Sequence, residues 1–134
     1  MTFEFIKRIT KSLNKCKVEY VITGGVARLL RNEIDSTLDL DILVQTNDKN
    51  IEAIKCFISG FGIDELTITK DLVNGKMLRL KLFPFSMDIL PKLDGLNIDQ
   101  VFFNKESIIY ENIRMDLIHR NDLIINYQNI NKNE

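Results

Sequence analysis

Three aspartates lie in settings where a carboxylate can take part in chemistry. Asp39 and Asp41 are two positions apart in the segment 38–44, which alternates with the period of a β-strand. Two carboxylates at this spacing project from one face of the strand, within about 7 Å, and repel each other unless a cation lies between them. A third, Asp88, lies in the apolar run 86–90. The expected cation is Mg²⁺, or Mn²⁺ in its place, because it prefers oxygen ligands and keeps waters or phosphate oxygens in its remaining positions.

The glycine pair Gly24-Gly25 follows a β-branched and aromatic run, 18–23, and precedes a segment with helical character, 26–31. A tight glycine turn lets backbone amides approach a phosphate, and the start of a helix carries partial positive charge. We therefore expect a triphosphate to lie against Thr23 to Val26. If Asp88 shares the face of the other two acids, it completes a second metal site and accepts the proton of an incoming hydroxyl, as in two-metal displacement at phosphorus.

Each of these motifs alone has an ordinary structural explanation. A Gly-Gly pair is often a plain turn, and Asp39-Leu40-Asp41 can be the solvated face of an edge strand. Asp88 can mark a strand that is exposed on one side. Their occurrence together and in this order favours a site over three unrelated surface features.

Basic residues near these motifs have two readings. Arg79 and Lys81 are two apart on the segment that precedes Asp88, so they share a face, which is either the active cleft or a solvated sheet surface. Arg28 and Arg31, after the glycine turn, have the same two readings. His119 and Tyr127 are interpreted as structural residues.

The periodicity of the chain predicts the elements that position these residues. Amphipathic helices are expected over the first fifteen residues and from Asn47 to Gly60, and a closing helix from Asn121 with Leu123, Ile124 and Tyr127 facing inward. Strand-like runs are 66–69, 77–83 and 85–90, followed by one extended element over 108–118. The expected fold class is α/β (α+β), a mixed β-sheet of about five strands flanked by helices.

Bulk composition bounds the class of protein. The length of 134 residues fits a single domain, 1–134, and the 45% hydrophobic and 28% charged content is that of a folded protein. A formal net charge of -1 gives no positive field for long nucleic acids. Cys16 and Cys56 lack the spacing of a zinc site and are expected to be reduced. With no apolar run of about 18 residues, we expect no membrane contact and a cytoplasmic location.

The residues described above resemble the DNA polymerase β-type nucleotidyltransferase superfamily. Its pattern is a strand, a Gly-Gly or Gly-Ser turn that opens a helix, a DxD-type strand and a third acid on a later strand. The corresponding segments here are Ile22–Ala27, Thr37–Val44 and Met87–Leu90. Within the superfamily the chain is similar to bacterial proteins of the AbiEii and MenT toxin type, to lincosamide-type antibiotic nucleotidyltransferases and to minimal MNT-type domains.

This resemblance implies a nucleotidyltransferase fold and transfer of a nucleoside monophosphate (NMP) from a nucleoside triphosphate (NTP) to a hydroxyl of a small molecule, a tRNA end or a protein. It also implies metal binding by Asp39, Asp41 and Asp88, with the catalytic metal on Asp88. The phosphates would be held by Gly24-Gly25, together with Thr23 and Arg28.

The chain departs from the family pattern in three ways. Gly25 stands where many members have Ser. Asp35 stands where an Arg is often found, so that Arg28 or Arg31 is the expected substitute. No helical domain follows residues 119–130, so acceptor recognition is expected to come from a second copy in a homodimer or from a partner protein.

An alternative from another class is a catalytically weak or inactive module that binds a nucleotide or a partner, such as an antitoxin-like protein or a regulatory subunit. The short chain and the departures from the family pattern favour it. A third reading is an α/β interaction domain whose acids are merely solvated.

Overall fold

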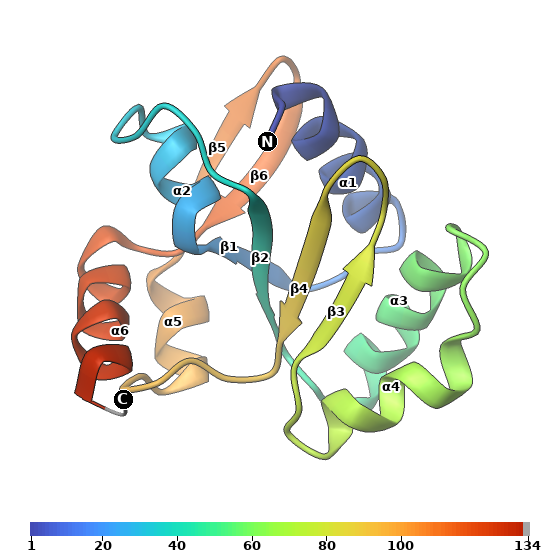
Figure 1. Cartoon of the computed structure of the whole chain (residues 1–134). Coiled ribbons are helices and arrows are strands. Elements are labelled where there is room, and N and C mark those ends of the chain that lie inside the picture. The colour runs from blue at the N-terminus through green and yellow to red at the C-terminus, as the bar shows by residue number, and fades with distance from the viewer. Residues whose placement is uncertain (133–134) are drawn as a thin grey trace.

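The computed structural model of the chain describes residues 1–132, apart from the side chains of residues 65–68 and 131–132. Within these residues six strands form one mixed sheet with the order β3-β4-β2-β1-β6-β5 (Figure 1). The β2–β4 and β1–β6 pairs are parallel, whereas β1–β2, β3–β4 and β5–β6 are antiparallel. The strands are β1 (Tyr20–Thr23), β2 (Asp39–Val44), β3 (Leu78–Lys81), β4 (Ser86–Leu90), β5 (Glu106–Tyr110) and β6 (Ile113–Leu117).

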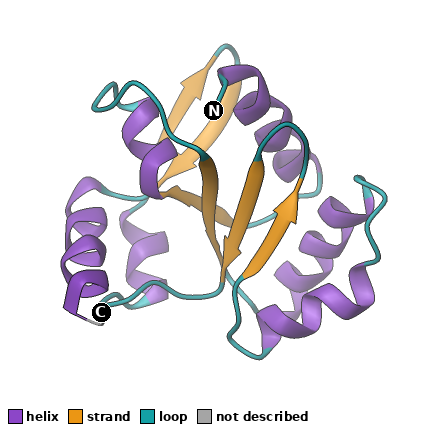
Figure 2. Cartoon of the chain, viewed as in Figure 1, coloured by secondary structure: helices purple, strands orange, loops and turns teal. Residues whose placement is uncertain are grey.

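Helices lie on both sides of this sheet. Figure 1 shows α1, α3 and α4 to one side of the strands and α2, α5 and α6 to the other, and Figure 2 shows the sheet between the two sets. The helices are α1 (Phe3–Lys15), α2 (Gly24–Leu30), α3 (Asp48–Ser59), α4 (Glu65–Val73), α5 (Ile98–Asn104) and α6 (Arg120–Lys132). This mixed α+β arrangement confirms the fold class predicted from the sequence, with one strand more than expected.

The helices begin where capping chemistry predicts. The hydroxyl of Thr2 accepts a hydrogen bond from the backbone N–H of Phe5 at the start of α1, and the side chain of Asn47 does the same for Asn50 at the start of α3. The apolar stripes of both helices then pack on the sheet, whose central strand β1 is buried along its whole length. The packing of α1 and α3 therefore holds in place the strands that carry the site, β1 and β2.

Two element predictions were wrong. Residues 66–69 belong to α4 and not to a strand, because Thr69 and Leu72, three residues apart, are buried where α4 packs beside α3. This packing outweighs the weak β-propensity of the segment. The element expected over 108–118 is a hairpin of β5 and β6, whose two-residue turn, Glu111-Asn112, has positive φ angles of 48° and 68°.

The C-terminal helices also differ from expectation. In α6, Leu123 is buried as predicted, but Ile124 is 47% exposed and Asn126 is buried in its place. The Asn126 side chain donates a hydrogen bond to the carbonyl of Asp94 at 3.0 Å, which ties α6 to the segment after β4. Helix α5, which the sequence did not predict, begins after the capping residue Asn97.

The two cysteines are paired, which corrects the prediction that both are reduced. Cys16, just after α1, and Cys56 in α3 form a disulfide with their Cα atoms 5.8 Å apart. The pairing arises from the contact between the two helices, which bring together residues 40 positions apart in the chain. Because disulfides are rare in the cytosol, this bond lends no support to the predicted cytoplasmic location. None of the described helices has the length and apolar character needed to cross a membrane.

Candidate active site

The three aspartates lie together on one face of the sheet. Asp39 and Asp41 alternate along β2, and β2 runs parallel to β4 in a register that places Asp41 opposite Asp88 and Asp39 opposite Ser86. All three carboxylates are partly buried. Acids that are 47 residues apart in the sequence are thus neighbours across a strand pair.

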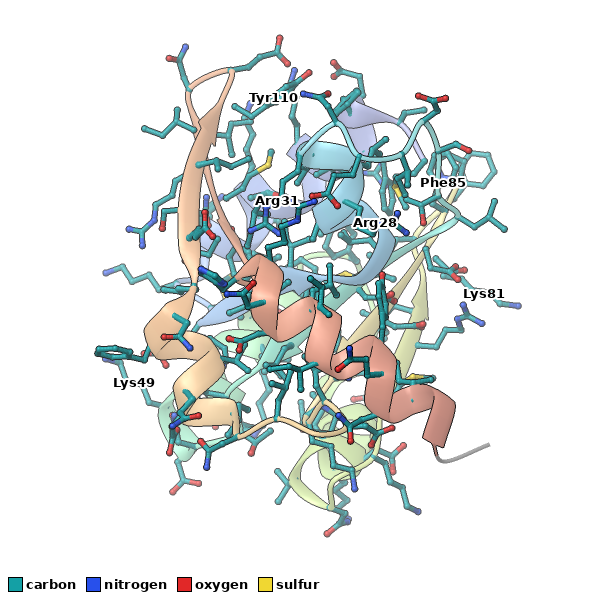
Figure 3. All side chains as sticks on the ribbon, turned by 90° about the vertical axis from the view of Figure 1, so that its left-hand side faces the viewer. Arg28, Arg31, Lys49, Lys81, Phe85 and Tyr110 are labelled. Carbon is teal, nitrogen blue, oxygen red and sulfur yellow. A yellow bond between two sulfur atoms is a disulfide. The ribbon has the colours of Figure 1, made fainter. Side chains whose placement is uncertain are left out.

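A single cation of the protein joins two of these acids. Arg79 on β3 pairs with Asp88 across the β3–β4 ladder, and its Nε lies 3.0 Å from Asp88 Oδ1. Its Nη2 lies 3.0 Å from Asp39 Oδ2. Arg79 therefore lies on the same sheet face as the acids, and its place in an active cleft stays a prediction. Lys81, two residues further along β3, extends away from the molecule in Figure 3.

Crowding of negative charge is strongest at Asp41. Burial of this carboxyl, followed by the charges of Asp88 and Asp39, raises the pKa of Asp41 to about 7, and the charge of Arg79 partly opposes the rise. Near neutral pH a cation bound beside Asp41 would therefore favour loss of the proton from this carboxyl. The contribution of Asp39 is the repulsion between two carboxylates on one strand face that the spacing predicted.

The glycine turn is built around the same carboxylate. Gly24 has a φ of +64°, and a Cβ at this position would lie 2.5 Å from Asp41 Oδ2. A Cβ at Gly25 would collide with the hydroxyl of Thr37, which lies just before β2. Both positions therefore require glycine for close approach of α2 to β2, and Gly24 also for its backbone conformation. The Thr37 hydroxyl lies where a side chain of residue 25 would begin.

Thr23, the residue before this turn, is unusual because its hydroxyl has no partner. It is the N-cap residue of α2, but its side chain makes no capping hydrogen bond. Among the described residues its Oγ1 is buried and accepts or donates no hydrogen bond. Such orphaned groups are uncommon in folded proteins and call for an explanation.

Comparison with solved structures identifies the fold. A protein from Thermotoga maritima described as a "putative nucleotidyltransferase", whose crystal structure is known at 1.87 Å resolution, superposes with a TM-score of 0.70 over 96% of this chain and 84% of that one. The chain has a nucleotidyltransferase fold. Sequence identity between the two is 13%, so the likeness concerns the fold alone. Neither a protein-family model nor a curated protein matches the sequence.

Within this nucleotidyltransferase fold, the donor set of the acid cluster suits a hard divalent cation. Asp39, Asp41 and Asp88 offer only carboxylate oxygens, and the raised pKa of Asp41 reflects in part the negative charge of the other two. Among the described residues, however, no group of three or more His, Cys, Asp or Glu side chains is arranged to hold a metal ion as it stands. The space between Asp39 and Asp88 is occupied by the guanidinium of Arg79. A metal on these ligands would have to displace it.

The arginines of α2 are engaged elsewhere. Arg28 forms an ion pair with Glu33 at 3.7 Å, and Arg31 donates to the carbonyl of Ile118 at 2.6 Å and faces Glu106 at 3.7 Å. Figure 3 shows both arginines above the start of α6. Among the described contacts, neither meets a carboxylate of the cluster, so the phosphate role of Arg28 stays a prediction.

A cavity of about 270 Å³ adjoins the cluster, and sequence reasoning missed it. Its lining includes Thr23, Gly24 and Asp41, and also Tyr127 and Ile130 of α6. Tyr127 was interpreted as a structural residue. The sequence did contain one signal for this position. Tyr127 follows Leu123 by four residues, which puts its aromatic side chain on the inner face of the closing helix.

Proposed function

We propose that this chain is a nucleotidyltransferase that moves an NMP from an NTP to an acceptor hydroxyl, with Mg²⁺ or Mn²⁺ held by Asp39, Asp41 and Asp88. The observation that carries the proposal is the convergence of these carboxylates from two non-consecutive strands next to a glycine turn. Loaded with metal, such a site neutralises the triphosphate and activates the reacting oxygens. The nucleotidyltransferase fold supports the assignment at the level of architecture.

The protein groups have distinct tasks in this reaction. Gly24 and Gly25 leave the turn free of side chains beside Asp41, so that backbone N–H groups can approach phosphate oxygens. Asp88 accepts the proton of the acceptor hydroxyl as its oxygen bonds to the α-phosphorus. The bond from that phosphorus to the β-phosphate bridging oxygen breaks, and pyrophosphate leaves.

The alternative is an NTP-binding module without turnover. The ion pairs of Arg79 with Asp39 and Asp88 favour it, because a guanidinium already neutralises two of the three acids. In this case NTP binding would regulate a partner protein and not supply a substrate.

A transfer assay separates the two functions. Purified protein is incubated with Mg²⁺ or Mn²⁺ and each of the four NTPs labelled at the α-phosphate, alone and with tRNA or small hydroxyl compounds. Release of pyrophosphate and transfer of label are measured for the wild type and for Asp39→Asn, Asp41→Asn and Asp88→Asn. The matched control is Asp71→Asn, an exposed acid on α4 across the sheet.

We expect turnover in the wild type and the control, and a loss of at least a hundredfold in each site variant. Nucleotide binding without pyrophosphate release from any acceptor would favour the alternative. Equal turnover in the wild type and the site variants would remove the assignment of the three acids.

A further inference from the structure

Strand β5 is an open edge of the sheet. It is the last strand in the order β3-β4-β2-β1-β6-β5, so it has a strand partner, β6, on one side only. Figure 3 shows the β5–β6 hairpin at the margin of the molecule, with no helix on its outer side. A free strand edge presents unpaired N–H and C=O groups, and another chain can pair with them.

The two edges of the sheet differ in the side chains that they expose. On β3, the opposite edge, the exposed side chains are those of Arg79 and Lys81, and charges of this kind discourage pairing with another strand. On β5 the side chain of Ile109 is 77% exposed, and the one charged residue is Glu106, at the start of the strand. Of the two edges, β5 is therefore the one suited to pairing with another chain.

The register of the hairpin determines which backbone groups of β5 face outward. The two-residue turn Glu111-Asn112 is closed by the pair Tyr110–Ile113, and in such a turn the closing pair exchanges hydrogen bonds between the strands. Hydrogen-bonded pairs alternate along an antiparallel ladder. The N–H and C=O groups of Ser107 and Ile109 therefore point to the free edge.

A second copy of β5 matches these outward groups. Antiparallel pairing about a two-fold axis at Ile108 places Ser107 of each copy opposite Ile109 of the other, so that the outward groups of both residues bond across the interface. The partly exposed Ile108 side chains then meet at the axis, and the two Ile109 side chains are diagonal neighbours on the other face. This register pairs all five residues of β5.

The charges that flank β5 favour the antiparallel orientation. Lys105 precedes the strand and Glu111 follows it. In the antiparallel arrangement Lys105 of one copy lies near Glu111 of the other, whereas parallel pairing would bring like charges together. The flanks of the strand are thus complementary to those of a second copy.

We propose that two copies of this chain associate through their β5 strands, antiparallel and with the two-fold axis at Ile108, so that one sheet continues across the dimer. The three aspartates lie on β2 and β4, which β1 and β6 separate from β5, so the proposal does not depend on the proposed function. Five paired residues form a small contact compared with the about 1,200–2,000 Å² of a standard stable interface. We therefore expect a reversible dimer whose population rises with protein concentration.

Sedimentation velocity over a range of protein concentrations tests this assembly. The wild type is compared with Ile109→Lys, which places a charge on the free edge, and with Ile109→Pro, which removes an outward N–H but no hydrogen bond to β6. The matched control is Phe83→Lys, which makes a similar change at an 86% exposed residue beside the other edge strand, β3.

We expect the apparent mass of the wild type and of the control to rise from that of one chain, 15.6 kDa, to twice this value. Both Ile109 variants should require a concentration roughly tenfold higher or more, because the two-fold axis makes each change count twice. A wild type that keeps the mass of one chain at its highest soluble concentration would overturn the proposal. A dimer that persists in both Ile109 variants, or that Phe83→Lys weakens equally, would also overturn it.

A cross-link tests the register and does not depend on weakening the dimer. In Ile108→Cys the introduced thiols of the two copies lie opposite each other at the axis, in a pair whose Cα atoms are about 4.5 Å apart, which a disulfide can span. Cys16 and Cys56 are already paired with each other. Mild oxidation should therefore give a covalent dimer on a non-reducing gel. If the control Ile124→Cys, at an exposed residue of α6, forms this dimer as fast as Ile108→Cys, the proposed pairing is wrong.

Discussion

Arg79 is the residue whose replacement separates the acid cluster from an ordinary ion-pair network. Its guanidinium contacts Asp39 and Asp88, each at 3.0 Å, where a divalent ion would have to bind. We predict that Arg79→Ala binds Mn²⁺ three- to tenfold more tightly than the wild type in the absence of nucleotide, because the competing cation is gone. Without metal the variant should unfold at a lower temperature, because the acids lose their counter-charge.

Electron paramagnetic resonance of free Mn²⁺ measures this change directly. Lys81→Ala is the matched control, because Lys81 lies two residues along the same strand and among the described residues has no carboxylate partner. Weaker Mn²⁺ binding by Arg79→Ala than by Lys81→Ala would show that Arg79 organises the acids and does not compete for them.

The protonation of Asp41 predicts how stability depends on pH. Since the pKa of Asp41 is raised to about 7 from an ordinary value of 3.8, the folded protein binds a proton between these values that the unfolded chain releases. This contribution to stability is present at low pH and is lost as the pH rises from about 4 to 7. In EDTA, the thermal midpoint of the wild type should therefore fall more steeply between pH 5 and 8 than that of Asp41→Asn, whose amide stays neutral. Parallel curves for the two proteins would refute the shift.

At the scale of elements, the turn between β1 and α2 depends on the close approach of Gly24 to Asp41. Alanine at position 24 meets both a left-handed backbone and the Asp41 carboxylate, whereas alanine at Gly62, with a φ of +73°, meets only open space. Each substitution should cost about 1–2 kcal/mol for the backbone. We predict that Gly24→Ala loses clearly more stability in urea than Gly62→Ala and also loses Mn²⁺ affinity. An equal loss in both variants would mean that the approach to Asp41 is not tight.

The elements that carry the site could be predicted from the sequence, because the signals for each of them lie close together in the chain. The alternation around Asp39 and Asp41, the breaker Gly24-Gly25 and the cap at Asn47 are encoded within a few residues, and β1, α2, β2 and α3 formed as predicted. The prediction of a strand over 66–69 was wrong because a short run that contains Thr and Ile takes its structure from the element that packs beside it, here α3. The β5–β6 hairpin was missed because Glu111-Asn112 lacks the glycine that usually marks such a turn.

Across the whole molecule, the sequence did not reveal which segments meet. The parallel pairing of β2 with β4, which brings Asp41 opposite Asp88, joins strands that are not consecutive, and local periodicity carries no information on it. The family resemblance implied only that a third acid on a later strand, Asp88, binds metal together with Asp39 and Asp41. The same limit explains the disulfide, since the spacing of Cys16 and Cys56 says nothing of the contact between α1 and α3.

The disulfide predicts a reductant-sensitive stability. Cys16 and Cys56 close a loop of 40 residues, and cross-links over such loops typically contribute about 2–4 kcal/mol, mainly by restricting the unfolded chain. The double variant Cys16→Ala, Cys56→Ala should unfold at a lower urea concentration than the oxidised wild type. A reducing agent should lower the wild type towards the variant and leave the variant unchanged. Two free thiols in wild-type protein unfolded without reductant would contradict the pairing.

The account depends most on the claim that Asp39, Asp41 and Asp88 together hold divalent metal next to a bound triphosphate. A crystal grown with Mn²⁺ and a non-hydrolysable NTP tests it in one map, because Mn²⁺ is located by its anomalous scattering. The account predicts an anomalous peak about 2.1–2.2 Å from carboxylate oxygens of these aspartates, with Arg79 moved off them and phosphate oxygens completing the ligands. A bound nucleotide with no metal on these carboxylates, and with Arg79 still paired to Asp39 and Asp88, would contradict it.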